Sequence, residues 1–349
     1  MKTLTIGRRA VGPGCPCFIL AEAGVNHNGV PELARRLVDV AAEAGADGVK
    51  FQTFKTDRLV SRQARKAGYQ VQTTGGTESQ FEMLRRLELS ADAHRDLVAR
   101  GQQRGLLFLS TPFDPESADL LDSLGVPAFK IGSGDVTNLP LLRHVARKGK
   151  PMLLSTGMSR LGEVEDALRA IEEAGHPDLI LLHCVSSYPA EPKDVNLRAM
   201  ATLAAAFQVP VGYSDHTIGS EVALAAVALG ACVIEKHFTL DRTLPGPDHQ
   251  ASIEPAELKA LVQGIRTVEQ ALGTGRKEPA ESEADVARAA RRSLVMAKDA
   301  PAGTVLTEDL VAVQRPGTGL PPALLPCVLG RRLREDVTAG TVIQLGMLG

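Results

Sequence analysis

The chain has 349 residues, of which 44% are hydrophobic, and this is enough for one large domain and a small one. Its formal net charge of -2 gives no basic excess for nucleic acid, and no apolar run approaches the length of a membrane span. We therefore expect a protein that binds neither nucleic acid nor membrane. The five cysteines are odd in number, and the first residues carry no signal-like apolar core, so we expect a cytoplasmic location.

The predicted elements begin with a short hairpin in residues 1–14. Eight apolar runs follow, and each ends in small polar or charged residues. The predicted strands are 18–25, 48–54, 106–113, 128–134, 151–157, 179–185, 209–214 and 231–238. Amphipathic helices are predicted between and after them, at 31–44, 91–104, 115–124, 163–174, 197–206, 220–229 and 255–272. Glycine follows most of these helices, and we expect left-handed turns at Gly45, Gly105, Gly125, Gly175 and Gly230.

Strands that alternate with helices predict parallel pairing, and eight such units in about 250 residues predict a (β/α)8 TIM barrel. An open doubly wound sheet is the alternative fold. It is disfavoured because AEAGVNHNG, which follows the first strand, lacks the spacing of a dinucleotide-binding glycine fingerprint. The long interval 55–80 has no clear periodicity, and we interpret it as a flap over the barrel mouth.

The composition changes after residue 272. The barrel is assigned to residues 1–273, and the polar stretch GTGRKEPAESEAD predicts a linker at 274–286. Residues 287–349 predict a small, mostly β module with short runs and tight turns. An internal repeat supports this module, because DAPAGTVL at 299–306 resembles DVTAGTVI at 336–343.

The catalytic groups of such barrels come from the C-terminal ends of the strands. These ends supply lysines, hydroxyls, carboxylates and histidines, namely Glu22, Asn26, Lys50, Gln52, Ser110, Thr111, Asp114, Lys130, Ser133, Asp135, Ser155, Thr156, His183, Ser186, Ser214, Asp215, His216, Glu235, Lys236 and His237. Lysines and hydroxyls that converge on one mouth predict an anionic, phosphate-bearing ligand, because their donors satisfy phosphate oxygens.

Two pairs of strand-end residues admit two interpretations each. His216 and His237 end neighbouring strands, and they either bind a divalent metal or make structural hydrogen bonds. Glu22 and Asp135 would face each other across the mouth, either as an acid–base pair or as partners of a lysine. His183 lies one residue inside its strand end, and we expect it to pack rather than bind.

A resemblance to a known family rests on the strand ends taken together. They read AEAGVNHNG, VKFQTFK, LSTPFD, FKIGSGD, LSTGM, LLHCVSSYPA, GYSDHTIG and IEKHFTLDRTLPGPDHQASIEP. In this order they resemble the sialic acid synthase family, over essentially the whole chain. The C-terminal module resembles that family's antifreeze-like (SAF) domain, a β-clip fold.

The resemblance implies a reaction. Phosphoenolpyruvate would condense with an N-acetylmannosamine-type sugar and water, with C–O cleavage, to give a nine-carbon 2-keto acid and phosphate. N-acetylneuraminate synthase is the favoured member. N,N'-diacetyllegionaminate synthase, which uses 2,4-diacetamido-2,4,6-trideoxymannose, is the alternative.

The resemblance also assigns residues by motif position. His216 and His237 would bind Mn2+ or Mg2+, and Glu22, assisted by Asp135, would manage the proton of the attacking water. The phosphoenolpyruvate ligands would be Lys50, Thr111, Lys130, Ser133, Ser155, Ser186 and Ser214. The sugar contacts would be Gln52, Phe113, Tyr188, Asp248 and, from the RPGTG loop of a second subunit in a domain-swapped homodimer, Arg315. Arg315 could otherwise be a surface turn residue.

Two competing functions are compatible with parts of the chain. A metal-free pyruvate aldolase would form a Schiff base on Lys50, Lys130 or Lys236. A carbohydrate-binding or ice-binding protein could be built on the antifreeze-like domain. Such a protein has no need of a full set of barrel strand-end residues, which disfavours this second alternative.

Overall fold

After an antiparallel hairpin, eight strands of the first unit alternate with helices and pair in parallel, as the sequence pattern predicts. A computed structural model describes residues 2–175 and 177–349. It divides into a first unit that ends at Gly273 and a second unit, Thr274–Gly349. Within the described residues, no helix is both long enough and apolar enough to cross a membrane.

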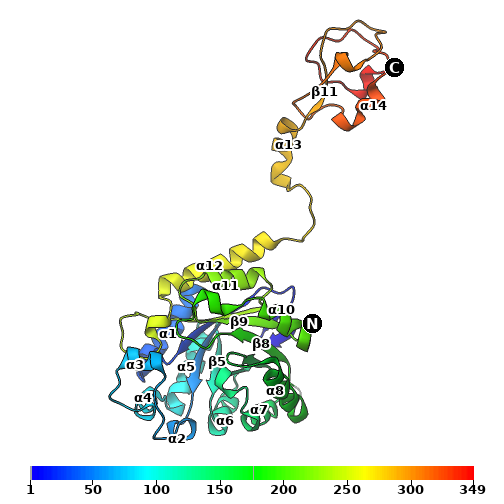
Figure 1. Ribbon diagram of the computed structural model, residues 1–349. Helices are drawn as coiled ribbons and strands as arrows, with labels where there is room; N and C mark the ends of the chain where they lie inside the picture. The colour runs from blue at the N-terminus through cyan, green and yellow to red at the C-terminus, as the bar shows by residue number, and fades with distance from the viewer. Residues whose placement is uncertain (1, 176) are drawn as a thin grey trace. The chain divides into compact units, whose positions relative to one another are not determined.

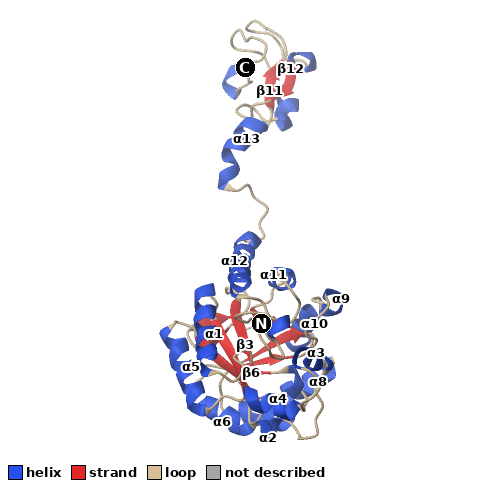
Figure 2. Cartoon of the chain, turned by 90° about the vertical axis from the view of Figure 1, so that its left-hand side faces the viewer, coloured by secondary structure: helices blue, strands red, loops and turns tan. Residues whose placement is uncertain are grey.

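Eight parallel strands form the centre of the first unit (Figure 2). They are β3 (Phe18–Gly24), β4 (Gly48–Thr53), β5 (Leu107–Pro112), β6 (Phe129–Ile131), β7 (Met152–Ser155), β8 (Leu179–Cys184), β9 (Val211–Asp215) and β10 (Val233–His237). Backbone pairing follows the order β5-β4-β3-β10-β9-β8-β7-β6, and β5 and β6 lie next to each other. The sheet is therefore a nearly closed barrel, and the predicted fold is confirmed.

Helices cover the outside of this barrel (Figure 1). They are α1 (Pro31–Ala44), α5 (Ala91–Gln103), α6 (Pro115–Ser123), α7 (Leu139–Ala146), α8 (Leu161–Ala174), α10 (Ala199–Phe207), α11 (Glu221–Ala228) and α12 (Pro255–Leu272). The helix α7 was not among the predicted helices. Gly45 ends α1 with φ 84°, as expected, but Gly175 after α8 has φ -173° and is not left-handed. Gly175 is needed for space instead, because a Cβ there would lie 2.3 Å from the carbonyl oxygen of Ala146.

Side-chain alternation along the strands divides the barrel into an apolar floor and a polar mouth. In β3, Phe18 and Leu20 belong to the inner core, whereas Ile19 and Ala21 pack in the core that includes the helices. The hairpin of β1 (Leu4–Ile6) and β2 (Arg9–Val11) adds apolar side chains to this inner core. Glu22 continues the inward series of β3, so the interior becomes polar at the C-terminal strand ends.

The interval 55–80 contains helices that the sequence analysis did not predict. They are α2 (Thr56–Leu59), α3 (Gly68–Thr74) and the start of α4 (Gln80–Leu87). A capping box begins α4, in which Ser79 Oγ accepts from Glu82 N and Ser79 N donates to the Glu82 carboxylate at 2.8 Å. One further short helix, α9 (Pro192–Val195), follows β8.

The second unit has a small core of its own. It contains the helices α13 (Ala284–Ala290) and α14 (Leu325–Val328), the antiparallel strands β11 (Ser293–Met296) and β12 (Val311–Gln314), and 3-10 turns at Glu281–Glu283, Glu308–Leu310, Pro322–Leu324 and Leu345–Met347. Part of the predicted linker, 274–286, is thus helical.

The two copies of the internal repeat face each other in this unit. Ala300 and Val337 exchange both backbone hydrogen bonds at 2.9 Å. Asp299 Oδ1 accepts from Ala339 N, and Asp336 Oδ1 accepts from Ala302 N, both at 2.7 Å. The repeat is therefore a local two-fold arrangement.

Candidate active site

All eight barrel strands contribute to one cavity of about 310 Å³ at their C-terminal ends. Strand register explains why, since Glu22 lies beside Lys50 on β4 and beside His237 on β10, and Glu235 lies beside Ser214. The predicted site residues that line the cavity are Glu22, Lys50, Gln52, Thr111, Phe113, Lys130, Ser133, Ser155, Ser186, Tyr188, Ser214, His216 and His237. The cavity thus collects residues that are far apart in the sequence.

Two buried lysines and two buried carboxylates form one wall of the cavity. Lys50 Nζ lies 2.5 Å from Glu22 Oε2 and donates to Thr111 Oγ1 at 2.9 Å. Lys130 Nζ lies 3.3 Å from Glu235 Oε1, which also accepts from Ser214 Oγ at 2.9 Å. Burial alone would raise the pKa of Glu235, but Lys130 and Lys50 lower it to about 2. The lysines are therefore balanced by carboxylates that also face the cavity.

Hydroxyl groups gather beside these lysines around Gly157. Ser133 Oγ accepts from Gly157 N at 2.9 Å, and a Cβ on Gly157 would lie 2.4 Å from Ser186 Oγ. Ser155 Oγ is buried and has no hydrogen-bond partner among the described residues. A buried donor without a partner is costly, so this corner suits a ligand that carries several acceptor oxygens.

The two strand-end histidines are neighbours, with ring centroids 5.3 Å apart. His216 Nδ1 donates to the Val185 carbonyl at 2.7 Å, which leaves Nε2 with its lone pair. His237 Nδ1 is buried and has no partner within residues 2–175 and 177–349. Burial lowers the pKa of His237 well below its ordinary value, and His216 lowers it further. Two neighbouring imidazoles that each present a nitrogen without a hydrogen-bond partner fit a divalent metal.

These histidines would be the principal protein ligands of such a metal. The described residues contain no group of three or more His, Cys, Asp or Glu arranged to hold a metal ion. The remaining coordination positions would then fall to water or substrate, as in open catalytic sites.

Asp215 and Lys236 point away from the cavity, as alternation requires. Lys236 Nζ lies 2.7 Å from Asp215 Oδ2 and donates to the Thr217 carbonyl at 2.5 Å. Asp215 Oδ1 also accepts from Thr217 N at 2.9 Å. This buried pair fixes the chain around His216. His183 faces the same outer side and contacts the Val195 carbonyl through Nε2 at 2.6 Å, so its expected packing role agrees with its position.

Asp135 does not occupy the place that the sequence analysis expected. The strand β6 ends at Ile131, and Asp135 lies on the 3-10 turn Ser133–Asp135. Its Oδ1 accepts from Asn138 Nδ2 at 2.9 Å, and it is not among the residues that line the cavity. The expected pair of Glu22 and Asp135 across the mouth is therefore not what the structure shows.

A second cavity of about 290 Å³ adjoins the first, and Asp248 lines it. The two cavities share Gln52, Tyr69, Phe113, Tyr188 and His237. Burial raises the pKa of Asp248 to about 6. Arg315 belongs to the second unit, where it follows β12 and its Nε donates to the Ala290 carbonyl at 3.1 Å.

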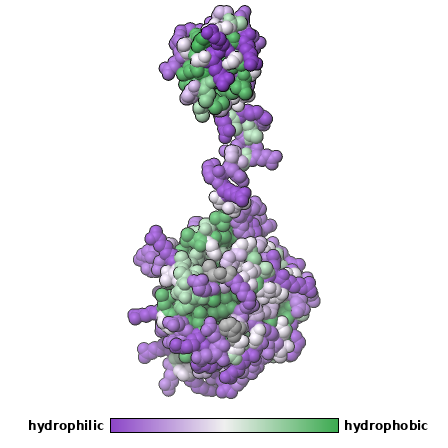
Figure 3. Space-filling model, turned by 90° about the vertical axis from the view of Figure 1, so that its right-hand side faces the viewer, coloured by the Kyte–Doolittle hydropathy of each residue, from purple (hydrophilic) through white to green (hydrophobic). Residues whose placement is uncertain are grey.

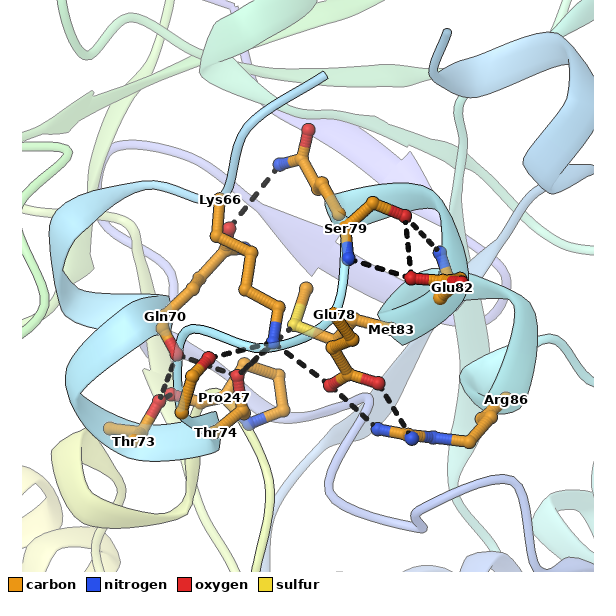
Figure 4. Close-up of polar contacts among 12 residues, drawn as sticks. Lys66, Gln70, Thr73, Thr74, Glu78, Ser79, Glu82, Met83, Arg86 and Pro247 are labelled. Atoms are coloured by element: carbon orange, nitrogen blue, oxygen red, sulfur yellow. Dashed lines mark hydrogen bonds and ion pairs between the residues drawn. The ribbon is translucent and has the colours of Figure 1, made fainter. Parts of the chain in front are cut away.

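Part of the interval 55–80 forms a wall of both cavities, through Tyr69 on α3. The Tyr69 ring lies 5.1 Å from the ring of Tyr188. Figure 4 shows how the segment is fastened: Lys66 Nζ donates to Thr74 Oγ1 at 2.7 Å and to Glu78 Oε1 at 2.9 Å. Arg86 also binds Glu78, at 2.6 Å. The segment is therefore a closed wall of the site in this structure.

Three polar residues of the first cavity, Glu235, Cys184 and Tyr69, have no assigned role in the sequence analysis. Glu235 was recognised only as a strand-end carboxylate, although it shares the inward parity of His237. Cys184 ends β8, and its Sγ lies 3.7 Å from His216 Nδ1 and 3.6 Å from Ser133 Oγ. Leu182 faces the inside of the barrel, and Cys184, two residues further along β8, must therefore face inward as well. Tyr69 carried no such signal, because α3 is only seven residues long.

Comparison with known proteins gives two family matches. Residues 37–277 match the NeuB family, and residues 291–349 match the SAF domain.

Three relatives are similar over most of the chain. A protein of Legionella pneumophila named N,N'-diacetyllegionaminic acid synthase is 48% identical, with 97% of this chain and 96% of that protein covered. A Campylobacter jejuni protein of the same name is 50% identical, with 87% and 91% covered. The crystal structure of an N-acetylneuraminic acid synthetase from Leptospira borgpetersenii, in complex with citrate, is 38% identical and has a TM-score of 0.72, with 82% of this chain and 95% of that one covered.

Proposed function

Since the chain belongs to the NeuB family of sialic acid synthases, we propose that it condenses phosphoenolpyruvate with 2,4-diacetamido-2,4,6-trideoxymannose to form N,N'-diacetyllegionaminate and phosphate. The sequence analysis favours N-acetylneuraminate synthase and keeps this reaction as the alternative. Relatives that carry the legionaminic name are 48% and 50% identical, and they favour the alternative. The site observation that carries the proposal is the pair of buried lysines among cavity hydroxyls.

Phosphoenolpyruvate is proposed to bind at the cationic wall. Lys50 and Lys130 would bind its carboxylate and phosphate, because ammonium groups satisfy anionic oxygens at close range. Hydroxyls around them would complete the phosphate site, and the residues proposed are Thr111, Ser133, Ser155, Ser186 and Ser214. The unpartnered Ser155 Oγ supports this assignment.

The chemistry proceeds in two bond-forming steps. The C3 methylene of phosphoenolpyruvate attacks the open-chain aldehyde carbon of the sugar, and the aldehyde oxygen gains a proton. Water then adds to the cationic C2. Its proton passes to Glu22, which is buried in the cavity wall. The bond between C2 and the bridging phosphate oxygen then breaks, phosphate leaves, and the C2 hydroxyl loses its proton to become the ketone. The two protons of the consumed water thereby end on the former aldehyde oxygen and on phosphate.

His216 and His237 are proposed to hold a divalent cation, Mn2+ or Mg2+. When bound, the cation would supply Lewis acidity at the sugar aldehyde. The support is the unpartnered His237 Nδ1 and the free Nε2 of His216. Val185 orients His216 for this role through its carbonyl oxygen.

The sugar is proposed to lie on the side of the cavity away from the lysines. The residues proposed to contact it are Gln52, Phe113, Tyr188 and Asp248. The first three line both cavities, and Asp248 lines the second, which supports this assignment. Arg315 of a partner subunit would complete the site in a domain-swapped homodimer, as the RPGTG motif suggests.

The test is phosphate release from phosphoenolpyruvate with each candidate sugar over a panel of metals. We expect higher kcat/KM with the trideoxy sugar than with N-acetylmannosamine, loss of activity with a chelator, and recovery with Mn2+ or Mg2+. A preference for N-acetylmannosamine would overturn the proposed acceptor. Inactivation by borohydride with pyruvate would instead support the aldolase, whose Schiff base needs Lys50 or Lys130, since Lys236 lies outside the cavity.

A further inference from the structure

One wall of the second cavity is apolar, although Asp248 and other polar side chains line the rest of it. Beyond the residues that the two cavities share, this wall contains the apolar side chains of Leu59, Val60, Met83 and Leu84. Met83 is buried, and the other three are half-buried. They project from α2, the residue after it and α4, and they line only the second cavity. The two lysines line only the first cavity, and Gln52 and Tyr188 line both. A ligand that spans both cavities would therefore meet charge at one end and apolar groups at the other.

The apolar wall is held rigidly in place. Leu59 and Leu84 pack on a core cluster that contains Met83 and Leu87. Ion pairs tie α2 to α4 and its C-terminal end, because Arg85 binds Asp57 at 2.7 Å and Glu88 accepts from Lys55 at 2.9 Å. Glu88 also accepts from Thr56 N at 3.1 Å. The wall is thus a preformed surface rather than a loose loop.

Two polar side chains that line this cavity from α3 and α4, Gln70 and Gln80, already bond to protein groups. Gln70 Oε1 accepts from Ala67 N at 3.0 Å and from Gln80 Nε2 at 3.3 Å. Gln70 Nε2 donates to Tyr69 OH at 3.3 Å. A hydroxyl pushed against Leu59 or Leu84 would lose water and gain no protein partner there, whereas a methyl group would lose nothing.

We infer that this cavity receives the C4 to C6 end of the acceptor sugar, and that Leu59, Val60 and Leu84 select a C6 methyl group over a hydroxymethyl group. This inference rests on the proposed function, because it takes the acceptor to be an amino sugar whose aldehyde faces the first cavity. Discrimination at such a pocket is worth about 10- to 200-fold in kcat/KM. The apolar wall is then the specificity determinant of the reaction.

The test compares kcat/KM for the trideoxy sugar and for N-acetylmannosamine in the full-length protein. Leu84→Asn and Leu59→Asn should each lower the ratio of the two values by about tenfold or more, with the KM for phosphoenolpyruvate unchanged. Leu84→Met should keep the ratio. Val71→Asn is the matched control, since Val71 is 41% exposed on α3 and does not line either cavity.

The outcomes separate the inference from the proposed function. An unchanged ratio in both asparagine variants overturns the inference while the reaction itself stands. No phosphate release from the wild type with either sugar overturns the proposed function. A wild type that prefers N-acetylmannosamine overturns the acceptor, and the variants still report whether this wall contacts C6. A variant that fails to fold is recognised by an altered circular dichroism spectrum and an equal loss of apparent kcat with both sugars, and the other variant then decides.

Discussion

Lys50 Nζ lies 2.5 Å from Glu22 Oε2 inside the barrel, and both side chains are almost fully buried. The register of β3 and β4 places these two residues directly opposite each other. Burial lowers the pKa of Lys50 to about 7, and a carboxylate partner lies beside it at the place where an anionic substrate would bind. This geometry allows Glu22 both to balance Lys50 and to accept a proton.

The substitution Glu22→Gln tests these two roles. We expect kcat to fall by about 10²- to 10⁴-fold, the usual worth of a general base, because the amide cannot take up the proton of water. Binding of phosphoenolpyruvate, measured by calorimetry, should persist, because the bound anion itself favours the charged form of Lys50, which also keeps its contact with Thr111. Unchanged turnover would remove Glu22 from the role. Asp135→Asn is the comparison variant, and its effect should be smaller because Asp135 lies outside the cavity.

The substitution Gly157→Ala tests the hydroxyl corner. A methyl group would lie 2.4 Å from Ser186 Oγ and 2.9 Å from Ser133 Oγ, so both hydroxyls must move. We expect the KM for phosphoenolpyruvate to rise by about tenfold, which corresponds to roughly one lost hydrogen bond to a charged group. The KM for the sugar should stay the same. Gly162→Ala on α8 is a suitable control, because a Cβ there meets no atom within 4 Å.

The carboxyl group of Asp248 predicts a pH dependence on the sugar side. Burial raises its pKa to about 6, so it is ionised above pH 6 and becomes neutral as the pH falls through that value. A neutral carboxyl group is a weaker acceptor for sugar hydroxyls. The kcat/KM for the sugar should therefore fall below about pH 6, and Asp248→Asn should flatten this limb of the profile. Persistence of the limb in Asp248→Asn would assign it to another group.

The buried side chain of Lys66 should hold the segment that contains α3 in its observed position. This side chain is only 2% exposed and binds Glu78 (Figure 4). Lys66→Met should make residues 61–79 about tenfold more sensitive to protease, which corresponds to roughly 1.4 kcal/mol. This is less than the 3–5 kcal/mol of a broken buried pair, because Glu78 keeps Arg86. Arg62→Met, whose side chain is exposed, is the control and should leave cleavage unchanged.

The two-fold contact of the second unit predicts symmetric effects on its stability. Asp299→Ala and Asp336→Ala each remove one 2.7 Å acceptor of a backbone N–H in equivalent positions. We expect both to lower the Tm of the second unit by a similar few degrees in the full-length protein. Glu308→Gln, on an exposed turn, should have no effect. A large effect from one aspartate alone would contradict the symmetric arrangement.

The barrel was predictable because its strands are apolar on both sides and end in polar residues. The same reasoning found the polar residues at the strand ends but did not separate those that face the cavity from those that face outward. It treated Lys236 and Asp215 as equivalent to Glu235 and Ser214. Alternation separates these neighbours into an outward and an inward pair. Inward and outward positions alternate along each strand. Counting them from the apolar residues at the floor of the barrel would have predicted which strand-end side chains face the cavity.

Other parts of the site lay beyond a reading of strand ends. Asp135 follows a strand of only three residues, and a 3-10 turn then ends the alternation. The helices of the interval 55–80 have four to eight residues, too few for a clear period. The capping box that begins at Ser79 was the one local signal. Figure 3 shows a face on which apolar residues also gather at the surface of the first unit, so hydropathy alone does not mark the site.

The most direct test of the central claim follows the oxygen atoms of the reaction. The protein would be incubated with Mn2+, the trideoxy sugar and phosphoenolpyruvate carrying ¹⁸O in its C2–O–P bridge, and both products would be analysed by mass spectrometry. The account predicts N,N'-diacetyllegionaminate without the label and phosphate that contains it, because the C–O bond breaks. A labelled keto acid, or no nine-carbon product, would contradict the account.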